Sequence, residues 1–408
     1  MPRTLFEHLS PDTGAKRILA LDGGGAKVML SLGMLKALED ELRRRAGGAS
    51  AFRLCDYYDL VSGSASAATV AAGLALGLSV DELADFYRRH AAAIFGKRPD
   101  DGVFLRPRLN ANRLRRSAQS LFSARTLGSD EVRTGLAFHL MRIDTGVAWL
   151  LTNHPLSRTY EQSATHLYAD KRYRLSDLVA ASAGGGGIAG DVEIGVDLDE
   201  KRRAAGKGHF IDLSGGGGAN PSVPVFRMAL DPAYRFGWRA GADELMMTSV
   251  GAGLRRPAIE GARLRAMPAA ARAAYVMRAA AYEAQVESIA LMQGLSSPKK
   301  PWRMHGETDD VTAPTFGGQA LLDYQRIDVA LDTKPKPRRA GDPQPPITGL
   351  ERVLGRELDA DTLYGLDLPN NGANANLELL FEIGVAVGRT FAGPSYPDPR
   401  FDLAEWRA

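Results

Sequence analysis

The sequence predicts an α/β fold with a central, mainly parallel sheet and a mostly helical C-terminal region. Two units of strand, small-residue turn and helix follow one another within the first 80 residues, a pattern typical of parallel layering. Short apolar runs then alternate with helical patterns, whereas residues 262–295 and the end of the chain show helical spacing alone. With 408 residues and 45% hydrophobic content, the chain can bury a sizeable core.

The first unit is a short apolar strand at residues 17–22 that runs into three glycines, Gly23, Gly24 and Gly25. Residues 29–45 then show helical spacing. Backbone N–H groups at the start of a helix are free to bind an anion, so this loop suits an oxyanion or a phosphate. Its spacing matches neither a Walker A loop nor a dinucleotide fingerprint. Taken alone, a glycine triplet after a strand is more often a tight turn.

The second unit has a predicted strand at residues 57–61, a turn of small residues at 62–68 and an apolar helix to residue 78. The apolar stretch is well short of the roughly 20 residues that cross a bilayer. The turn has the composition of a nucleophile elbow, but the serine position of G-x-S-x-G holds Ala65. A turn of this kind before an apolar helix is usually an N-cap.

The remaining elements alternate along the chain. Strands are predicted at residues 135–142, 146–151, 209–212 and 245–250, and helices at 80–94, 109–121 and 175–183. The glycine runs at 184–187 and 215–218 predict loops, because regular structure disfavours glycine. Residues 334–346, rich in Pro, Lys and Arg, predict a linker or an exposed excursion.

Charge and cysteine content narrow the function. The 51 Lys and Arg against 48 Asp and Glu leave a net charge of +3, too small to make nucleic acid the default partner. The single cysteine, Cys55, cannot form an intrachain disulfide, and no Cys/His cluster has zinc-ligand spacing. The N-terminus lacks the basic-then-apolar order of a secretory signal. We therefore expect a protein of the reducing cytoplasm with no structural metal.

Taken together, the two turns resemble those of the patatin-like phospholipase family. Its members carry a D-G-G-G-x-R-G oxyanion loop near the N-terminus, a G-x-S-x-G elbow about 40 residues later, and an Asp-Gly pair on a later strand. The segments similar to these three blocks are residues 19–25, residues 58–63, and residues 210–212 followed by 219–221. Further segments similar to bacterial members are residues 177–183, 234–238, 248–253 and 324–329, so the resemblance runs from about residue 15 to about 390.

The resemblance implies a three-layer α/β/α fold with an N-terminal extension at residues 1–14, a catalytic domain at 15–255 and a helical region at 256–408 packed on the same domain. It implies a lipid acyl hydrolase that cleaves fatty-acyl esters of membrane glycerophospholipids with a Ser-Asp dyad and no cofactor. The implied site consists of Ala65 at the nucleophile position, Asp212 as the base, Gly23, Gly24, Gly25 and Lys27 at the oxyanion hole, and Gly63, Ser64 and Ser66 in the elbow. We expect Asp212 to meet the elbow at the carboxyl ends of a parallel sheet.

The sequence departs from the family pattern where the chemistry lies. Ala65 replaces the nucleophilic serine, Ala67 the second elbow glycine, and Lys27-Val28 the Arg-Gly of the loop. Leu213 follows Asp212 where a glycine is expected. Because losing the nucleophile typically lowers the rate by orders of magnitude, the chain as written is predicted to be inactive.

Three accounts of Ala65 stay open from the sequence. It is a deliberate knockout of the nucleophile of an active hydrolase, or it marks a natural pseudoenzyme that binds a lipid, a nucleotide or a protein partner in the former cleft, or Ser64 or Ser66 attacks instead. Some bacterial relatives attack the cell's own membrane when a cyclic nucleotide binds, so the resemblance permits a small-molecule activator. Basic residues at 43–45 and 334–339 could help the protein reach the inner membrane surface.

Overall fold

The computed structural model describes residues 3–95, 111–161, 169–184, 191–213, 218–298, 300–302, 318–331, 349–368 and 370–406. The whole predicted excursion at 334–346, and most of the two glycine runs, lie outside these residues. None of the helices in the described ranges is long and apolar enough to cross a bilayer.

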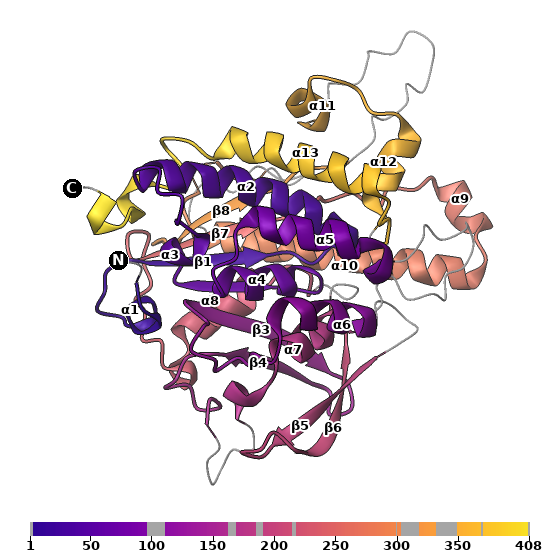
Figure 1. Cartoon of the computed structure of the whole chain (residues 1–408). Helices are drawn as coiled ribbons and strands as arrows, with labels where there is room; N and C mark the ends of the chain where they lie inside the picture. The colour runs from indigo at the N-terminus through magenta and orange to yellow at the C-terminus, as the bar shows by residue number, and fades with distance from the viewer. Residues whose placement is uncertain are drawn as a thin grey trace.

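An eight-stranded sheet forms the centre of the molecule (Figure 1). Five strands run parallel in the order β3, β2, β1, β7, β8, and β4, β5 and β6 add antiparallel pairings at the β3 side. Their bounds are β1 (Lys16–Leu21), β2 (Leu60–Gly63), β3 (Gly135–Arg142), β4 (Val147–Thr152), β5 (Val192–Leu198), β6 (Ala204–Ile211), β7 (Leu245–Val250) and β8 (Asp323–Ile327). The predicted mainly parallel α/β sheet is confirmed.

Helices cover both faces of this sheet. Leu19 and Leu21 of β1 belong to one hydrophobic core, and Ile18 and Ala20 to the other, as expected for a strand buried on both sides. The first core is shared with α2 (Val28–Arg45), α4 (Ala67–Ala75), α5 (Val80–Ile94), α6 (Ala111–Phe122), α7 (Leu175–Ala183) and α13 (Asn374–Phe391). The second is shared with α8 (Ser222–Leu230) and the end of α10 (Ala269–Gly294).

The C-terminal helix α13 lies along α2, the helix that follows the glycine loop (Figure 1). The two backbones touch at glycines: a Cβ on Gly33 would lie 2.3 Å from the Phe381 carbonyl oxygen, and one on Gly384 2.1 Å from that of Leu30. Strand β8, which like α13 follows residue 255, joins the sheet. The domain boundaries at 15 and 255 stay a prediction.

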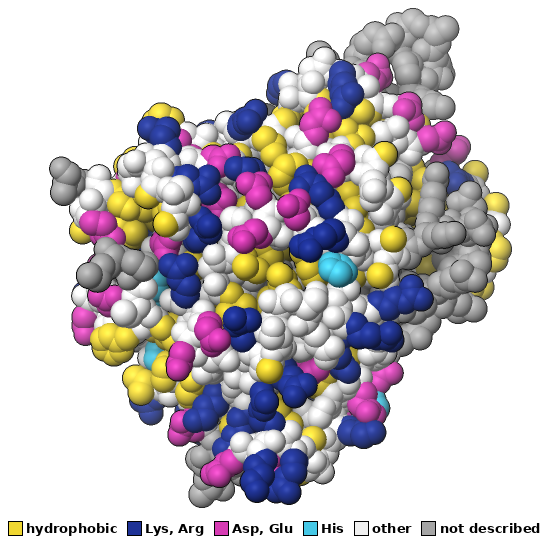
Figure 2. Space-filling model, in the orientation of Figure 1, with side chains coloured by type: hydrophobic (Ala, Val, Ile, Leu, Met, Phe, Trp, Pro, Cys, Tyr) yellow, Lys and Arg dark blue, Asp and Glu magenta, His cyan; other side chains and the backbone are white. Residues whose placement is uncertain are grey.

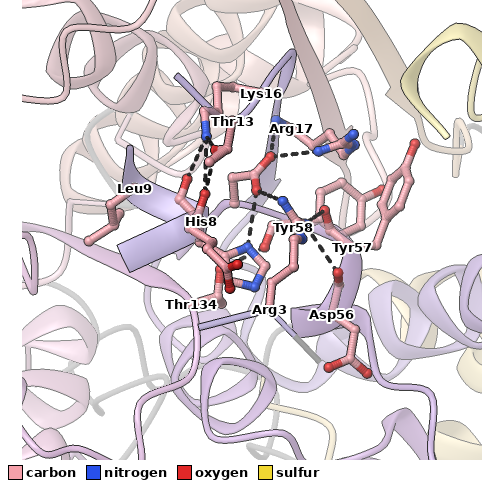
Figure 3. A network of polar contacts seen from close by, with 12 residues as sticks. Arg3, His8, Leu9, Thr13, Lys16, Arg17, Asp56, Tyr57, Tyr58 and Thr134 are labelled. Carbon is pink, nitrogen blue, oxygen red and sulfur yellow. Dashed lines mark hydrogen bonds and ion pairs between the residues drawn. The ribbon is translucent and has the colours of Figure 1, made fainter. Parts of the chain in front are cut away.

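Asp59, which directly precedes β2, ties the N-terminal segment to the end of the sheet where β1 begins. Figure 3 shows Arg3, His8 and Arg17 in the network around it. The Asp59 carboxylate is fully buried and lies 2.6 Å from Arg3 Nη1, 3.0 Å from Arg17 Nη1 and 3.0 Å from His8 Nδ1. Burial alone would raise the pKa of Asp59, but its two arginine partners and His8 outweigh burial and lower the pKa. The carboxylate therefore stays charged and holds the extension against β1 and β2.

Several boundaries differ from prediction. The strand expected at 57–61 starts only at Leu60, because Tyr57 ends the short helix α3 (Leu54–Tyr57). The helical region at 262–295 is two helices, α9 (Gly261–Ala266) and α10, interrupted before Pro268, whose ring prevents a continuous helix. The helix expected from residue 109 is described from Ala111. Strands β5 and β8 are additions that the apolar pattern did not predict.

Candidate active site

The turn between β2 and α4 has the geometry of a nucleophile elbow. Its tip, Ala65, has φ +49°, in the left-handed region that residues with a Cβ rarely adopt. Gly63 allows the sharp turn, because a Cβ there would lie 2.2 Å from the Ala67 carbonyl oxygen. The sequence therefore builds the strained strand-to-helix turn of the motif, with a methyl group at its tip.

The glycine loop passes directly against this tip. A Cβ on Gly23 would lie 3.0 Å from the Cβ of Ala65, and one on Gly24 would lie 2.5 Å from the Cβ of Ala252. The Ser66 hydroxyl donates a hydrogen bond of 2.9 Å to the Gly25 carbonyl oxygen, which joins the elbow to the loop. The two predicted turns are thus in contact, and only glycine fits at the closest approaches.

The backbone amides of the loop differ in what they already bind. The Gly23 amide donates to the Ala219 carbonyl oxygen, and the Lys27 amide donates to that of Gly24. Within the described ranges, the Gly24 and Gly25 amides have no hydrogen-bond acceptor. Of the four residues predicted for the oxyanion hole, Gly24 and Gly25 therefore keep amides that a substrate oxygen could use.

The Lys27 side chain is also engaged. Its ammonium donates to the Gly253 carbonyl oxygen at 3.1 Å and lies 3.5 Å from Asp367 Oδ1. The same carboxylate accepts from Arg278 at 2.6 Å and from Arg255 at 3.4 Å. Lys27 thus joins a group of three cations around one carboxylate beside the loop.

Asp212 directly follows β6, and the pairing of β6 brings it to the elbow. Strands β2 and β6 pair with the same edge of β3, because β4 occupies the other edge. Ser62 pairs with Ala137 and Ile211 with Met141, four residues further along β3. At about 3.3 Å per residue, Ser62 and Ile211 lie about 13 Å apart, and the two strand ends face each other across this gap.

The prediction that Asp212 lies at the carboxyl end of a parallel strand is wrong. β6 runs antiparallel to β3, so Asp212 does not lie at the carboxyl end of a strand parallel to β2. Strands β2 and β6 instead run towards each other along the same edge of β3. The elbow and Asp212 still follow strand ends that point towards each other along the same edge of β3.

The last turn of α7 contacts both partners. The Ser182 hydroxyl accepts a hydrogen bond of 2.9 Å from the Ala65 amide, and the Gly184 carbonyl oxygen accepts one of 3.2 Å from the Asp212 amide. Gly184 has φ +37°, and a Cβ there would lie 2.0 Å from the Asp212 nitrogen. Ser182 and Gly184 are therefore site residues whose role the sequence reasoning missed, although both lie in segments it had singled out.

A buried ion network supports the loop from behind. Asp22, the residue before Gly23, receives Arg326 in a bidentate pair of 2.9 and 2.5 Å, and Gln285 of α10 donates to it at 2.6 Å. Arg326 also donates to Asp328 at 2.6 Å, and Asp328 accepts from the Gly253 amide. Burial opposes the charge of Arg326, but Asp22 and Asp328 outweigh burial and raise its pKa. The resemblance flagged residues 324–329, but no local signal predicted this pairing.

The described part of the chain contains no group of three or more His, Cys, Asp or Glu side chains arranged to hold a metal ion. The elbow, the glycine loop and Asp212 are the segments for which the sequence predicted a nucleophile position, amide donors and a carboxylate.

Comparison with known proteins agrees with this geometry. Residues 19–201 match the family model described as patatin-like phospholipase. A "cGAMP-activated phospholipase" of Vibrio cholerae is 37% identical over 90 residues, which cover 22% of this chain and 24% of that protein. A "cUMP-AMP-activated phospholipase" of Escherichia coli is 39% identical over 82 residues, 20% of this chain and 23% of that protein. The matched segments thus span about a quarter of these relatives.

Among solved structures, human GIVD cytosolic phospholipase A2 aligns with a TM-score of 0.49 and 13% identity, over 98% of this chain and 62% of that one. VipD from Legionella pneumophila aligns with a TM-score of 0.32 and 11% identity, over 90% and 67%. The family match over residues 19–201, together with the sheet and the two turns described above, identifies these residues as a patatin-like phospholipase domain.

Proposed function

We propose that this fold is a lipid acyl hydrolase that cleaves fatty-acyl esters of membrane glycerophospholipids, and that the chain as written is inactive because Ala65 stands at the nucleophile position. The observation that carries the proposal is the strained tip of the elbow. A left-handed residue with a Cβ costs about 1–3 kcal/mol and persists only where the surroundings impose it. Ala65 keeps this conformation against the glycine loop, which supports a turn shaped to present a nucleophile.

A serine at position 65 would supply the missing chemistry. Its hydroxyl oxygen would attack the ester carbonyl carbon while the Asp212 carboxylate takes the hydroxyl proton. The carbonyl oxygen would become an oxyanion next to the Gly24 and Gly25 amides, which have no acceptor in the described ranges. Collapse would release the alcohol, which takes the proton, and water would then hydrolyse the acyl-enzyme. Alanine has no oxygen for the first step.

The neighbouring serines are poor substitutes. Ser66 is fully buried and its hydroxyl donates to the Gly25 carbonyl oxygen, so its proton is already used within the loop. Ser64 is 4% exposed and lies one residue before the tip. Because acyl transfer tolerates little misplacement of the attacking atom, neither serine replaces the one missing at 65.

The same proposal extends to regulation and location. Two relatives carry the names of cyclic-dinucleotide-activated phospholipases, which supports a cyclic dinucleotide as the activator of the parent activity here. Its lipid substrate places the protein at the cytoplasmic membrane surface as a peripheral protein.

The deciding experiment compares the chain with its Ala65→Ser variant on a fluorogenic short-chain ester and on mixed phospholipid vesicles, each with and without cGAMP. We expect turnover only with serine, and loss of at least about a thousandfold when Asp212→Asn is added. If Ala65→Ser stays silent under all conditions while its elbow geometry is intact, the hydrolase proposal is wrong. The chain is then a binding protein that holds a ligand or a partner in the former cleft.

A further inference from the structure

Residues 261–282 form an exposed arm beside the site. The arm comprises α9 and about the first four turns of α10, and Figure 1 shows it standing out from the body at the right-hand side. None of its residues is buried, whereas the second half of α10 buries Val286, Ile289 and Met292. Tertiary packing therefore does not account for the side chains of the arm.

The composition of the arm is apolar and basic. It contains four arginines at 263, 265, 272 and 278, and no Asp, Glu or Lys. Most other residues are Ala, Leu, Met, Val or Tyr, and Val276 and Met277 are 58% and 48% exposed. Figure 2 shows hydrophobic side chains at the edge where Figure 1 places the arm. Exposed apolar helices flanked by arginines are typical of segments that lie in a membrane interface.

The positive charge of the arm is available to a partner. Arg278 shares Asp367 with Lys27 and Arg255, so three cations face one carboxylate. Arg272 donates to two backbone carbonyl oxygens, and the described ranges provide no carboxylate partner for it, for Arg263 or for Arg265. The surplus charge favours an anionic partner.

The other basic segments have less positive charge available to an anionic partner. The arginines at 43–45 are paired with four carboxylates, those of Glu39, Asp40, Glu41 and Asp402. Residues 334–339 lie outside the described residues. After residue 282 the arm ends, because Glu283 and Glu287 are exposed on the same helix and bring negative charge. All charged side chains of the arm are therefore positive.

The position of the arm connects it to the site. Gln285 follows the arm on α10 and donates to Asp22, the residue directly before the glycine loop. Arg278 within the arm and Lys27 of the loop share the Asp367 carboxylate. Whatever binds the arm is therefore held next to the elbow and the loop.

We propose that the arm is the surface by which this protein docks on a bilayer of anionic phospholipids, a proposal that rests on the proposed lipid hydrolase function. Val276 and Met277 enter the boundary between headgroups and acyl chains, and the arginines bind headgroup phosphates. A second copy of the chain is a weaker candidate, because a two-fold contact through this surface would bring arginines against arginines.

The test uses the chain as it is, with Ala65, in co-sedimentation with vesicles of phosphatidylglycerol and phosphatidylethanolamine, and with vesicles of phosphatidylcholine alone. One variant combines Arg263→Gln, Arg265→Gln and Arg272→Gln, and another combines Val276→Asp and Met277→Asp. The matched control combines Phe6→Asp and Leu156→Asp, which are 77% and 70% exposed outside the arm. Thermal unfolding checks that all variants fold.

We expect the chain to prefer the anionic vesicles and the triple arginine variant to partition about a hundredfold less into them, since each basic residue near an anionic surface contributes about 1 kcal/mol. The apolar variant should also lose binding, and the control should not. Equal binding by folded arm variants overturns the proposal. The proposal is also overturned if an arm variant leaves vesicle binding unchanged and changes only the molecular mass measured by sedimentation equilibrium. That result assigns the surface to a second copy of the chain.

Binding and catalysis are separable in this design. Vesicle binding needs no nucleophile, so a silent Ala65→Ser variant contradicts the proposed function without affecting the docking result. If Ala65→Ser is active, the arm changes should lower hydrolysis of anionic vesicles and leave hydrolysis of the soluble short-chain ester unchanged. Equal losses on both substrates contradict docking and indicate damage to the site.

Discussion

A buried aspartate lies beside each end of strand β1, and the two differ in their partners and in what they support. At the start of the strand, Asp59 is surrounded by Arg3, Arg17 and His8, so two guanidinium groups face one carboxylate. After its end, Asp22 shares the single guanidinium of Arg326 with Asp328. The first cluster fixes a chain terminus, and the second fixes the backbone of a loop that must hold two amides in place.

The largest effect should come from removing the guanidinium at the site end. Arg326→Met leaves two buried carboxylates without a cation, so we expect the free energy of unfolding to fall by about 3–5 kcal/mol at pH 7. Urea unfolding measures the loss. Arg326→Lys keeps one charge and should recover part of it. A loss below about 1 kcal/mol for Arg326→Met would mean that the network does not support the loop.

Removing the carboxylate at the other end should cost less. Asp59→Asn keeps the volume and loses the ion pairs with Arg3 and Arg17, so we expect a loss of about 2 kcal/mol at pH 7. Because the folded-state pKa of Asp59 lies below its ordinary value, its contribution is complete above about pH 4 and is lost as the pH falls further. Unfolding of both chains between pH 7 and pH 3 should show the gap closing. A gap that stays constant with pH would contradict the ion pairs.

A further buried aspartate, Asp170, sharpens the comparison, because no cation of the described residues forms an ion pair with it. Asp170 is 1% exposed and accepts from Thr159 at 2.6 Å, and burial raises its pKa to about 7. Its neutral form is favoured in the fold, so its contribution is present below about pH 4 and is lost as the pH rises towards 7. We expect Asp170→Asn to stabilise the protein by about 1 kcal/mol at pH 8 and not at pH 4. Destabilisation at pH 8 would indicate a cation that pairs with Asp170.

The smallest effect concerns the link between the arm and the loop. Gln285→Ala removes one donor to Asp22 and leaves the bidentate Arg326 pair intact, so stability should change by about 1 kcal/mol or less. In an active Ala65→Ser background, kcat should fall a few-fold while KM stays the same, because the loop amides bind the transition state rather than the substrate. Ser288→Ala, one turn further along α10, is the matched control. A change in KM alone would assign Gln285 to substrate binding instead.

The sequence predicts those parts of the molecule whose structure depends on residues close together in the chain. The glycine loop and the turn at Ala65 are visible because small residues directly follow an apolar strand, and both elements form where expected. Strand β8 is hidden, because three of its five residues are Asp323, Gln325 and Arg326, all buried. Their burial depends on partners far along the chain, such as Asp22, 304 residues before Arg326.

The direction of β6 shows the same limit. A period-two pattern indicates a strand but carries no information on whether its neighbour runs parallel. The position of Asp212 at a strand end that points towards the end of β2 therefore follows from the fold of the whole sheet, although the resemblance had already singled out this residue. Ser182 and Gly184 belong to the site for the same reason, since their contacts with Ala65 and Asp212 join separate segments.

The glycine contact between α2 and α13 has a consequence for synthesis of the chain. Gly33 and Gly384 touch partners on each other's helix, yet about 350 residues separate them, which a ribosome adds in roughly 20 to 70 seconds. During that time the face of α2 that later receives α13 has no partner within the nascent chain. The packing of α13 on α2 can therefore form only after translation has passed α13.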